Sequence, residues 1–160
     1  MKIREAKPAD YNQVWEIFKS VIETGEYFAF DPKTKKEALS QLWFASNMKT
    51  YVVVENDKVL GSYYIKPNQP SLGAHIANCG YMVSEDCYEK GVGKLMCSHS
   101  IENAIDLKYK ALQFNMVVSC NQVAIKLWES YDFKIIGTIP KGFKHSKKGL
   151  VDAYIMYKEL

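Results

Sequence analysis

The stretch that decides the fold runs from Cys79 to Leu107 and reads CGYMVSEDCYEKGVGKLMCSHSIENAIDL. Its beginning is apolar and predicts a strand that ends at Val83. Its second half predicts a helix, because apolar residues recur there at helical spacing, at Cys97, Ile101, Ala104 and Ile105. Between them lies a polar loop that finishes with Gly91-Val92-Gly93-Lys94. We therefore interpret this stretch as strand, loop and helix.

The segment Gly91–Lys94 predicts an anion site at the start of the helix. Two glycines at a strand-to-helix junction let the backbone approach a ligand closely. The first N–H groups of a helix have no internal partner, and the helix dipole adds positive potential there, which suits a phosphate or pyrophosphate. The segment lacks the further residues of a dinucleotide fingerprint or a P-loop. On this motif alone, a glycine turn that merely begins a helix is an equally good interpretation.

Composition bounds the class of protein. The 160 residues are 48% hydrophobic and 24% charged, which predicts a single globular domain over residues 1–160. A net charge of +3 is too small to indicate nucleic-acid binding. No apolar run reaches the ~18 residues that span a membrane, and the first residues resemble no signal peptide, so we expect a cytoplasmic protein. The four cysteines and three histidines have no metal-ligand spacing, so no metal is expected.

The remaining periodicity predicts an order β-α-α-β-β-β-α-β-α-β-β. Strands are expected at 3–5, 51–55, 59–66, 75–83, 111–118, 133–139 and 151–157, and helices at 11–22, from about 34, after 93 and from 121. Gly80 inside the fourth strand predicts a bulge or a close ligand approach. The order predicts an α/β (α+β) fold, in which a twisted, mostly antiparallel mixed sheet of six or seven strands carries four helices on both faces.

The element order and two motifs resemble the GCN5-related N-acetyltransferase (GNAT) family over essentially the whole chain. The first motif, Val83 followed after seven residues by Gly91-Val92-Gly93-Lys94-Leu95, is similar to the family's acetyl-CoA pyrophosphate loop. The second, Asn121-x-x-Ala124-x-x-Leu127-Trp128-x-x-x-x-Phe133, is similar to its Asn-x-x-Ala-x-x-Leu-Tyr-x-Lys-x-Gly-Phe pattern. The resemblance implies an acyltransferase that moves the acetyl group of acetyl-CoA to an amine by direct attack in a ternary complex.

The resemblance also implies roles for residues around the cofactor. The backbone N–H groups of Gly91, Val92, Gly93 and Lys94 would hold the pyrophosphate, with Lys90 and Lys94 adding charge; a solvated helix start is an equal alternative for the two lysines. The end of the fourth strand, at Met82 and Val83, would pair with the pantetheine arm, and an N–H near Met82 would face the thioester oxygen. Asn121 would contact CoA, although it also fits a plain helix N-cap.

A closer resemblance is carried by the segments Tyr63–Asn68, His75–Asn78 and Phe114–Val117, together with Asn121, which look like the GNAT branch that contains the yeast L-azetidine-2-carboxylate (proline-analogue) acetyltransferase. It implies that Asn78 and Asn115 take part in substrate binding and catalysis. Both amides lie in strands that look buried, where asparagine is disfavoured and needs hydrogen-bond partners. A satisfied structural hydrogen bond is the alternative for each. Cys120, beside Asn121, has no histidine partner in the local sequence, so a covalent acetyl-enzyme is not expected.

The sequence indicates the residues that bind the acceptor less clearly. Phe28, Phe30 and Trp43 are expected to wall the acceptor pocket, with core packing as an equal alternative. The lysine-rich segment 140–149, around Phe143 and His145, predicts a solvated loop, and attraction of a carboxylate is the alternative. The expected acceptor is a small-molecule amine, such as an amino acid or proline analogue, and a homodimer is the expected assembly.

One departure from the family pattern keeps a second class of function open. Many family members have a tyrosine where this chain has Trp128, and that hydroxyl protonates the departing thiolate, which an indole N–H cannot do. No carboxylate lies on the fourth strand to serve as a base. A non-catalytic acyl-CoA-binding or sensor module is therefore one alternative, and a protein or peptide N-acetyltransferase is another.

Overall fold

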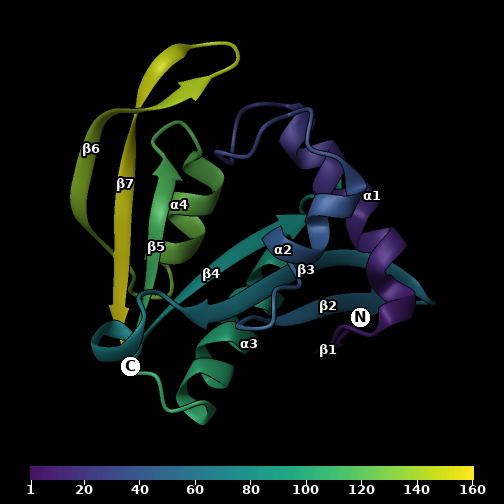
Figure 1. The fold of residues 1–160 in the computed structure, drawn as a ribbon. Helices are drawn as coiled ribbons and strands as arrows, with labels where there is room; N and C mark the ends of the chain where they lie inside the picture. The colour runs from purple at the N-terminus through teal and green to yellow at the C-terminus, as the bar shows by residue number, and fades with distance from the viewer.

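A computed structural model describes all 160 residues (Figure 1). The strands are β1 Lys2–Glu5, β2 Lys49–Glu55, β3 Lys58–Pro67, β4 Ile76–Val83, β5 Ala111–Val118, β6 Lys134–His145 and β7 Gly149–Glu159. The helices are α1 Tyr11–Glu23, α2 Leu39–Leu42, α3 Val92–Asp106 and α4 Gln122–Glu129. Along the chain this order is the one predicted from the sequence, and the seven strands form one sheet in the order β1-β2-β3-β4-β5-β7-β6.

The sheet divides into two halves between β4 and β5. Every neighbouring pair of strands is antiparallel except β4 and β5, which are parallel and pair only at Ile76–Ala111, Ala77–Leu112 and Asn78–Gln113. Beyond Asn78 the two strands continue without pairing, and Figure 1 shows them running apart. The gap between them separates the half β1–β4 from the half β5–β7–β6.

Helices cover both faces of the sheet, as predicted. The apolar stripe of α1 packs with α2 on one face, against Val52, Val54 and Met82. Helix α3 packs on the other face, where its Met96, Cys97 and Ala104 meet inward-facing residues of β2–β5. Ile105, which belongs to the same helical pattern, is half exposed. No helix is both long and apolar enough to cross a bilayer.

The structure corrects three local predictions. The segment 140–149 is mostly strand, because β6 runs to His145 and pairs with β7 from Gly149, which leaves Ser146–Lys148 as the turn. Its Phe143 and His145 are buried at alternate positions, a strand pattern that the surrounding lysines obscured. The second helix is a single turn, Leu39–Leu42, after a 3₁₀ turn.

The third correction concerns Gly80. The β3–β4 register is continuous through Gly80, so there is no bulge. The close approach is made by a side chain of the protein, because a Cβ at Gly80 would lie 2.7 Å from the Tyr64 ring. This glycine therefore makes room for Tyr64.

The β6–β7 turn joins the two halves of the molecule across the gap. The Ser146 N–H donates to the Gly25 carbonyl at 3.0 Å, and the Ser146 hydroxyl donates to the Thr24 carbonyl at 2.6 Å. Next to them, the Lys147 ammonium forms an ion pair with the Glu26 carboxylate. Gly25 has φ +63°, and a Cβ there would lie 3.0 Å from that of Ser146, so the backbone turn and the contact both favour glycine.

A partly buried ion pair fixes the turn that leads into α1. The Arg4 guanidinium donates to both oxygens of Asp10, at 2.7 and 2.9 Å, and the Lys7 N–H donates to the same carboxylate at 2.7 Å. The hydrogen bond from Arg4 lowers the pKa of Asp10, despite the opposing effect of burial. Asp10 is therefore ionised, and it ties the 3₁₀ turn Pro8–Asp10 that leads into α1 to β1.

We expect Asp10→Asn to lower the free energy of unfolding by about 1.5–3 kcal/mol at pH 7, the usual range for a hydrogen bond to a charged group. A lowered pKa gives stability that is present above the unfolded value of about 3.9 and is lost as the pH falls through the folded value. The difference between wild type and variant should therefore narrow below about pH 4. Urea titrations at pH 7 and pH 3 measure it, and a difference independent of pH would contradict this role.

Candidate functional site

Helix α3 begins with free backbone donors. Gly91, the N-cap, has φ +81°, and no side chain caps the helix. The first intrahelical bond runs from the Leu95 N–H to the Gly91 carbonyl at 3.0 Å, so the N–H groups of Val92, Gly93 and Lys94 have no helical partner. Lys90 and Lys94 are exposed beside them. The strand–loop–helix prediction is confirmed, and its geometry suits an anion.

The backbone of β4 presents hydrogen-bonding groups to the gap. The Ile76 carbonyl accepts from Asn68, and the Ser84 N–H donates to Leu60, so the even-numbered residues of β4 pair with β3. Met82 is one of these, and its side chain is buried in the α1-side core. The N–H and C=O groups of Tyr81 and Val83 point the other way, into the gap. The N–H groups near Met82 that face the gap, where the sequence places a thioester oxygen, therefore belong to Tyr81 and Val83.

Asn78 lies where the two strands separate. It is 6% exposed, its amide N–H donates to the Gln113 carbonyl at 3.0 Å, and its amide oxygen accepts from the Tyr64 hydroxyl at 3.2 Å. Asn78 is therefore buried and hydrogen-bonded, as the sequence predicted. One of those partners, Tyr64, was given no role from the sequence, and only the strand register brings it beside Asn78.

Asn115 differs from the prediction that it is buried. It is exposed, because the β5–β7 register shifts between Phe114 and Val117 and turns this part of β5 outward. Its amide donates to Asn68 at 2.7 Å and accepts from the Gln113 side chain at 3.0 Å. Gln113 thus links the two predicted asparagines, with its carbonyl bound to Asn78 and its side chain bound to Asn115.

The three predicted aromatic residues form one cluster that ends at Tyr64. Phe28 stacks on Phe30 with ring centroids 5.6 Å apart, and it meets Trp43 edge-on at 6.1 Å. Trp43 in turn meets Tyr64 edge-on at 4.9 Å. Trp43 is fully buried and its indole N–H donates to Ser62, whereas Phe28 and Phe30 are partly exposed. The cluster is therefore part of the core, and of the three predicted residues only Phe28 and Phe30 are partly exposed to solvent.

Trp128 packs behind the gap. Its ring lies 4.4 Å from Phe114 and 6.0 Å from Tyr81, measured between centroids. The Tyr81 hydroxyl is bound to Ser100 at 2.7 Å, and burial raises its pKa well above the usual value. The Tyr81 hydroxyl is therefore engaged with Ser100 and stays protonated near neutral pH.

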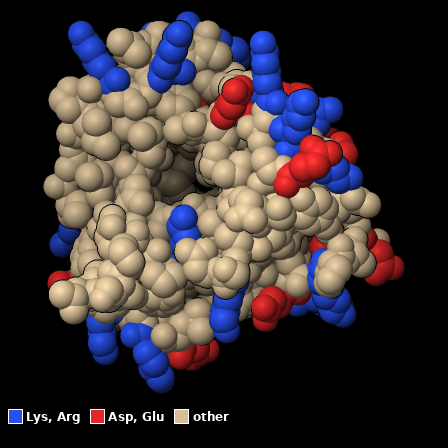
Figure 2. All heavy atoms as spheres, viewed as in Figure 1, with Lys and Arg blue, Asp and Glu red and all other residues tan.

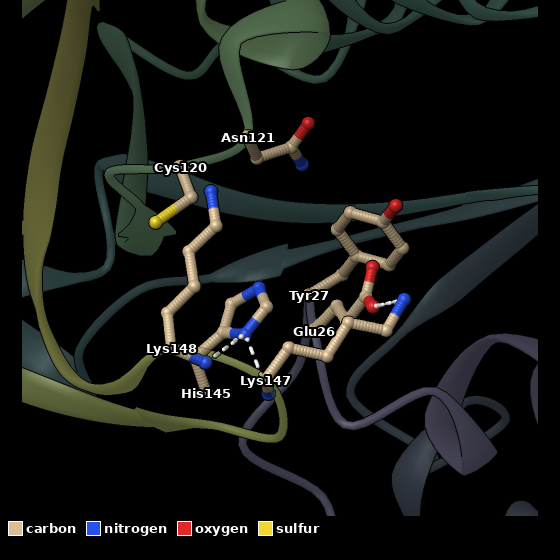
Figure 3. Close-up of a pocket in the computed structure, with 7 residues that line it drawn as sticks. All are labelled: Glu26, Tyr27, Cys120, Asn121, His145, Lys147 and Lys148. Atoms are coloured by element: carbon tan, nitrogen blue, oxygen red, sulfur yellow. Dashed lines mark hydrogen bonds and ion pairs between the residues drawn. The ribbon is translucent and has the colours of Figure 1, made fainter.

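Asn121 caps α4 and also lines a cavity. Its side-chain oxygen accepts from the Ala124 N–H at 3.3 Å, which confirms the predicted N-cap. The cavity, of about 230 Å³, lies between the α1–α2 loop, the β5–α4 junction and the β6–β7 turn (Figure 3). Its lining residues are Glu26, Tyr27, Cys120, Asn121, His145, Lys147 and Lys148.

A hollow in the space-filling view separates the two halves of the molecule at the gap (Figure 2). The free N–H groups of α3 and the odd-numbered backbone of β4 supply donors on the β1–β4 side. The amide series of Asn78, Gln113 and Asn115 lies where the gap begins. No group of three acidic, histidine or cysteine side chains that could hold a metal ion is present. The arrangement suits an extended anionic ligand with a polar acceptor beside it.

Comparisons with known proteins agree with this geometry. A profile of the acetyltransferase (GNAT) family matches residues 12–133. The N-acetyltransferase aca1 of Schizosaccharomyces pombe is 30% identical over 151 residues, covering 84% of this chain and 72% of that protein. A GCN5-related N-acetyltransferase structure from Kribbella flavida is 37% identical, with a TM-score of 0.95 over 99% of this chain and 97% of that one.

The fold is also similar to that of a structure that contains acetyl-CoA. The acetyltransferase yncA of Salmonella typhimurium, solved with its cofactor acetyl-CoA, has a TM-score of 0.83 at 22% identity, over all of this chain and 94% of its own. At that identity the likeness concerns the fold alone.

We expect Gly93→Asp to weaken acetyl-CoA binding by at least ~100-fold, about 2.7 kcal/mol, because it places a side chain and a negative charge at the free N–H groups. The helix should remain folded, since an acidic residue in the first turn favours it, and the nearest atom to a new Cβ is the flexible end of Leu127, at 3.3 Å.

The matched control is Gly93→Asn, which has nearly the same volume without the charge. Calorimetry with acetyl-CoA should give a smaller loss for Asn than for Asp. Equal affinity of wild type and Gly93→Asp would remove the pyrophosphate assignment.

Proposed function

This chain belongs to the GNAT family of acetyltransferases, and we propose that it transfers the acetyl group of acetyl-CoA to an amine of a small molecule, by direct attack in a ternary complex. The observation that carries the proposal is the incomplete β4–β5 pairing, which leaves backbone groups of Tyr81 and Val83 free beside the uncapped start of α3.

The proposed binding of acetyl-CoA uses backbone groups. The N–H groups of Val92, Gly93 and Lys94 bind the pyrophosphate, and the pantetheine arm extends β4 as a strand would. An N–H of Tyr81 or Val83 donates to the thioester oxygen and stabilises the negative charge that develops there. Lys90 and Lys94 add positive charge at the phosphates.

In the proposed reaction, the amine lone pair attacks the thioester carbonyl carbon, the carbon–sulfur bond breaks, and CoA leaves as the thiolate. A thiol of pKa near 8.5 is a tolerable leaving group, so no acid is required at the position of Trp128. The amine proton passes to water, because no carboxylate lies on β4. The amides of Asn78 and Asn115 orient the acceptor.

The contact between the β6–β7 turn and the end of α1 supports a small acceptor, because it closes the side of the gap on which the acceptor would bind. The β6–β7 turn is bound to the end of α1 and to the α1–α2 loop, so a protein surface would have to displace these contacts. The proposal includes a homodimer and a cytoplasmic location, the latter supported by four unpaired cysteines.

A screen of amines that follows release of free CoA tests the function, and acetyl-CoA binding without turnover on any amine would favour the sensor alternative.

We expect Asn115→Ala to lower kcat by ~10²-fold, with little change in KM for acetyl-CoA, if its amide meets the acceptor mainly in the transition state. Because Asn115 is exposed, the melting temperature of the Asn115→Ala variant should stay near that of the wild type. Asn78→Ala should also lower kcat, but with a lower melting temperature, since it leaves the Tyr64 hydroxyl and the Gln113 carbonyl without partners.

The control is Asn47→Ala, at an exposed turn position before β2, which should change neither quantity. Thermal stability and kcat are measured on the same preparations. Normal turnover in Asn115→Ala, or early melting with normal turnover in Asn78→Ala, would show that these residues are not part of the catalytic site.

We expect Trp128→Phe to keep kcat within about threefold of wild type, because the ring contact with Phe114 is retained and only a weak donor is lost. The rate of CoA release at saturating substrates measures this. A loss of ~100-fold in a folded variant would instead assign the indole N–H a part in thiolate departure.

A further inference from the structure

The cavity beside Asn121 has the charges and donors to recognise a carboxylate (Figure 3). Resting on the proposed function, we infer that the acceptor is an amine that carries a carboxylate, as an amino acid does, and that His145 and Lys148 bind this carboxylate in the cavity.

His145 presents a fixed donor to the cavity. It is 6% exposed, and its Nδ1 accepts from the backbone N–H groups of Lys147, at 3.1 Å, and Lys148, at 3.3 Å. A ring nitrogen that accepts carries no hydrogen, so the proton of the neutral imidazole is on Nε2. Nε2 has no partner in the protein, and Figure 3 shows it turned toward the space between Lys148, Asn121 and Tyr27.

The cavity separates positive and negative charge. Lys148 forms none of the ion pairs of the structure, and it lines the cavity together with Cys120 and Asn121. On the other side is the Glu26 carboxylate, whose pKa is lowered by the hydrogen bond from Lys147 and which is therefore ionised. The charge of Glu26 is thus paired with Lys147, whereas Lys148 has no counter-ion, so a ligand that brings a carboxylate to Lys148 and His145 matches this distribution.

The size and position of the cavity suit one end of a small acceptor better than a phosphate of CoA. A volume of about 230 Å³ is below the ~300–1,000 Å³ of a complete ligand site, so the cavity is a subsite. None of the residues at the start of α3 lines it. The phosphates therefore have a separate set of donors at the start of α3.

Two substitutions of His145 separate its two roles. His145→Asn keeps an acceptor near the position of Nδ1 for the turn and removes the Nε2 donor. His145→Gln keeps a donor near the position of Nε2 and removes the acceptor. The screen uses pairs of free L-amino acids and their carboxamides as acceptors.

The wild type should prefer the free acid of each pair by at least ~10-fold in kcat/KM. His145→Asn should raise KM for the acid by ~10-fold and leave KM for the carboxamide and for acetyl-CoA unchanged, while His145→Gln should retain most of the preference. Lys148→Ala should reduce the same preference. Equal use of acid and carboxamide by the wild type, or an unchanged preference in His145→Asn, would overturn the inference and leave the proposed function intact.

A binding measurement separates the two sources of the anion. Nitrogen-15 NMR of the His145 ring should show the Nε2–H tautomer, shifted by amino acids added to the CoA complex and not by CoA alone. A shift with CoA and none with amino acids would assign the cavity to a phosphate and overturn the inference. If no amine releases CoA, the proposed function fails, and this titration still decides whether amino acids bind here.

Discussion

The structure depends on where the hydrogen bonding between β4 and β5 stops. Pairing ends at Asn78 and Gln113, although β4 continues to Val83 and β5 to Val118. Buried backbone groups without partners cost free energy, so the gap is stable only if water or a ligand meets them. Two features prevent the strands from closing. The Asn78 side chain occupies the Gln113 carbonyl at the point of separation, and the irregular register around Asn115 bends β5 away.

Helix α3 must hold its free N–H groups in place beside this gap, and a set of neutral hydrogen bonds fixes it on the sheet. The Tyr63 hydroxyl binds the His99 ring at 2.7 Å and accepts from Asn103, which also accepts from Tyr51. Burial raises the pKa of both tyrosines and lowers that of His99, so all members stay uncharged near neutral pH. The positive potential at the start of α3 is therefore not cancelled by charges packed beneath it.

The sequence was sufficient for what is local and periodic. Helical and alternating patterns predicted the element order, and the glycine pair predicted the start of α3, because both depend on neighbours a few residues away. It was insufficient for contacts between distant segments, such as Tyr64 with Asn78 or Glu26 with Lys147. Asn115 was expected to be buried because apolar residues flank it, and only the β5–β7 register places it outside. The strand through Phe143 was obscured because lysines occupy its outward positions.

The contact between the β6–β7 turn and the end of α1 depends largely on backbone groups. Two of its bonds end on the backbone carbonyls of Thr24 and Gly25, and one starts from the Ser146 N–H, so they constrain few side chains. Glu26 and His145 also hold the turn, because Glu26 pairs with Lys147 and His145 accepts from the N–H groups of Lys147 and Lys148. Lys148 makes no such side-chain contact, so a change at Lys148 would alter the charge on this side of the gap without altering the backbone groups of Tyr81 and Val83.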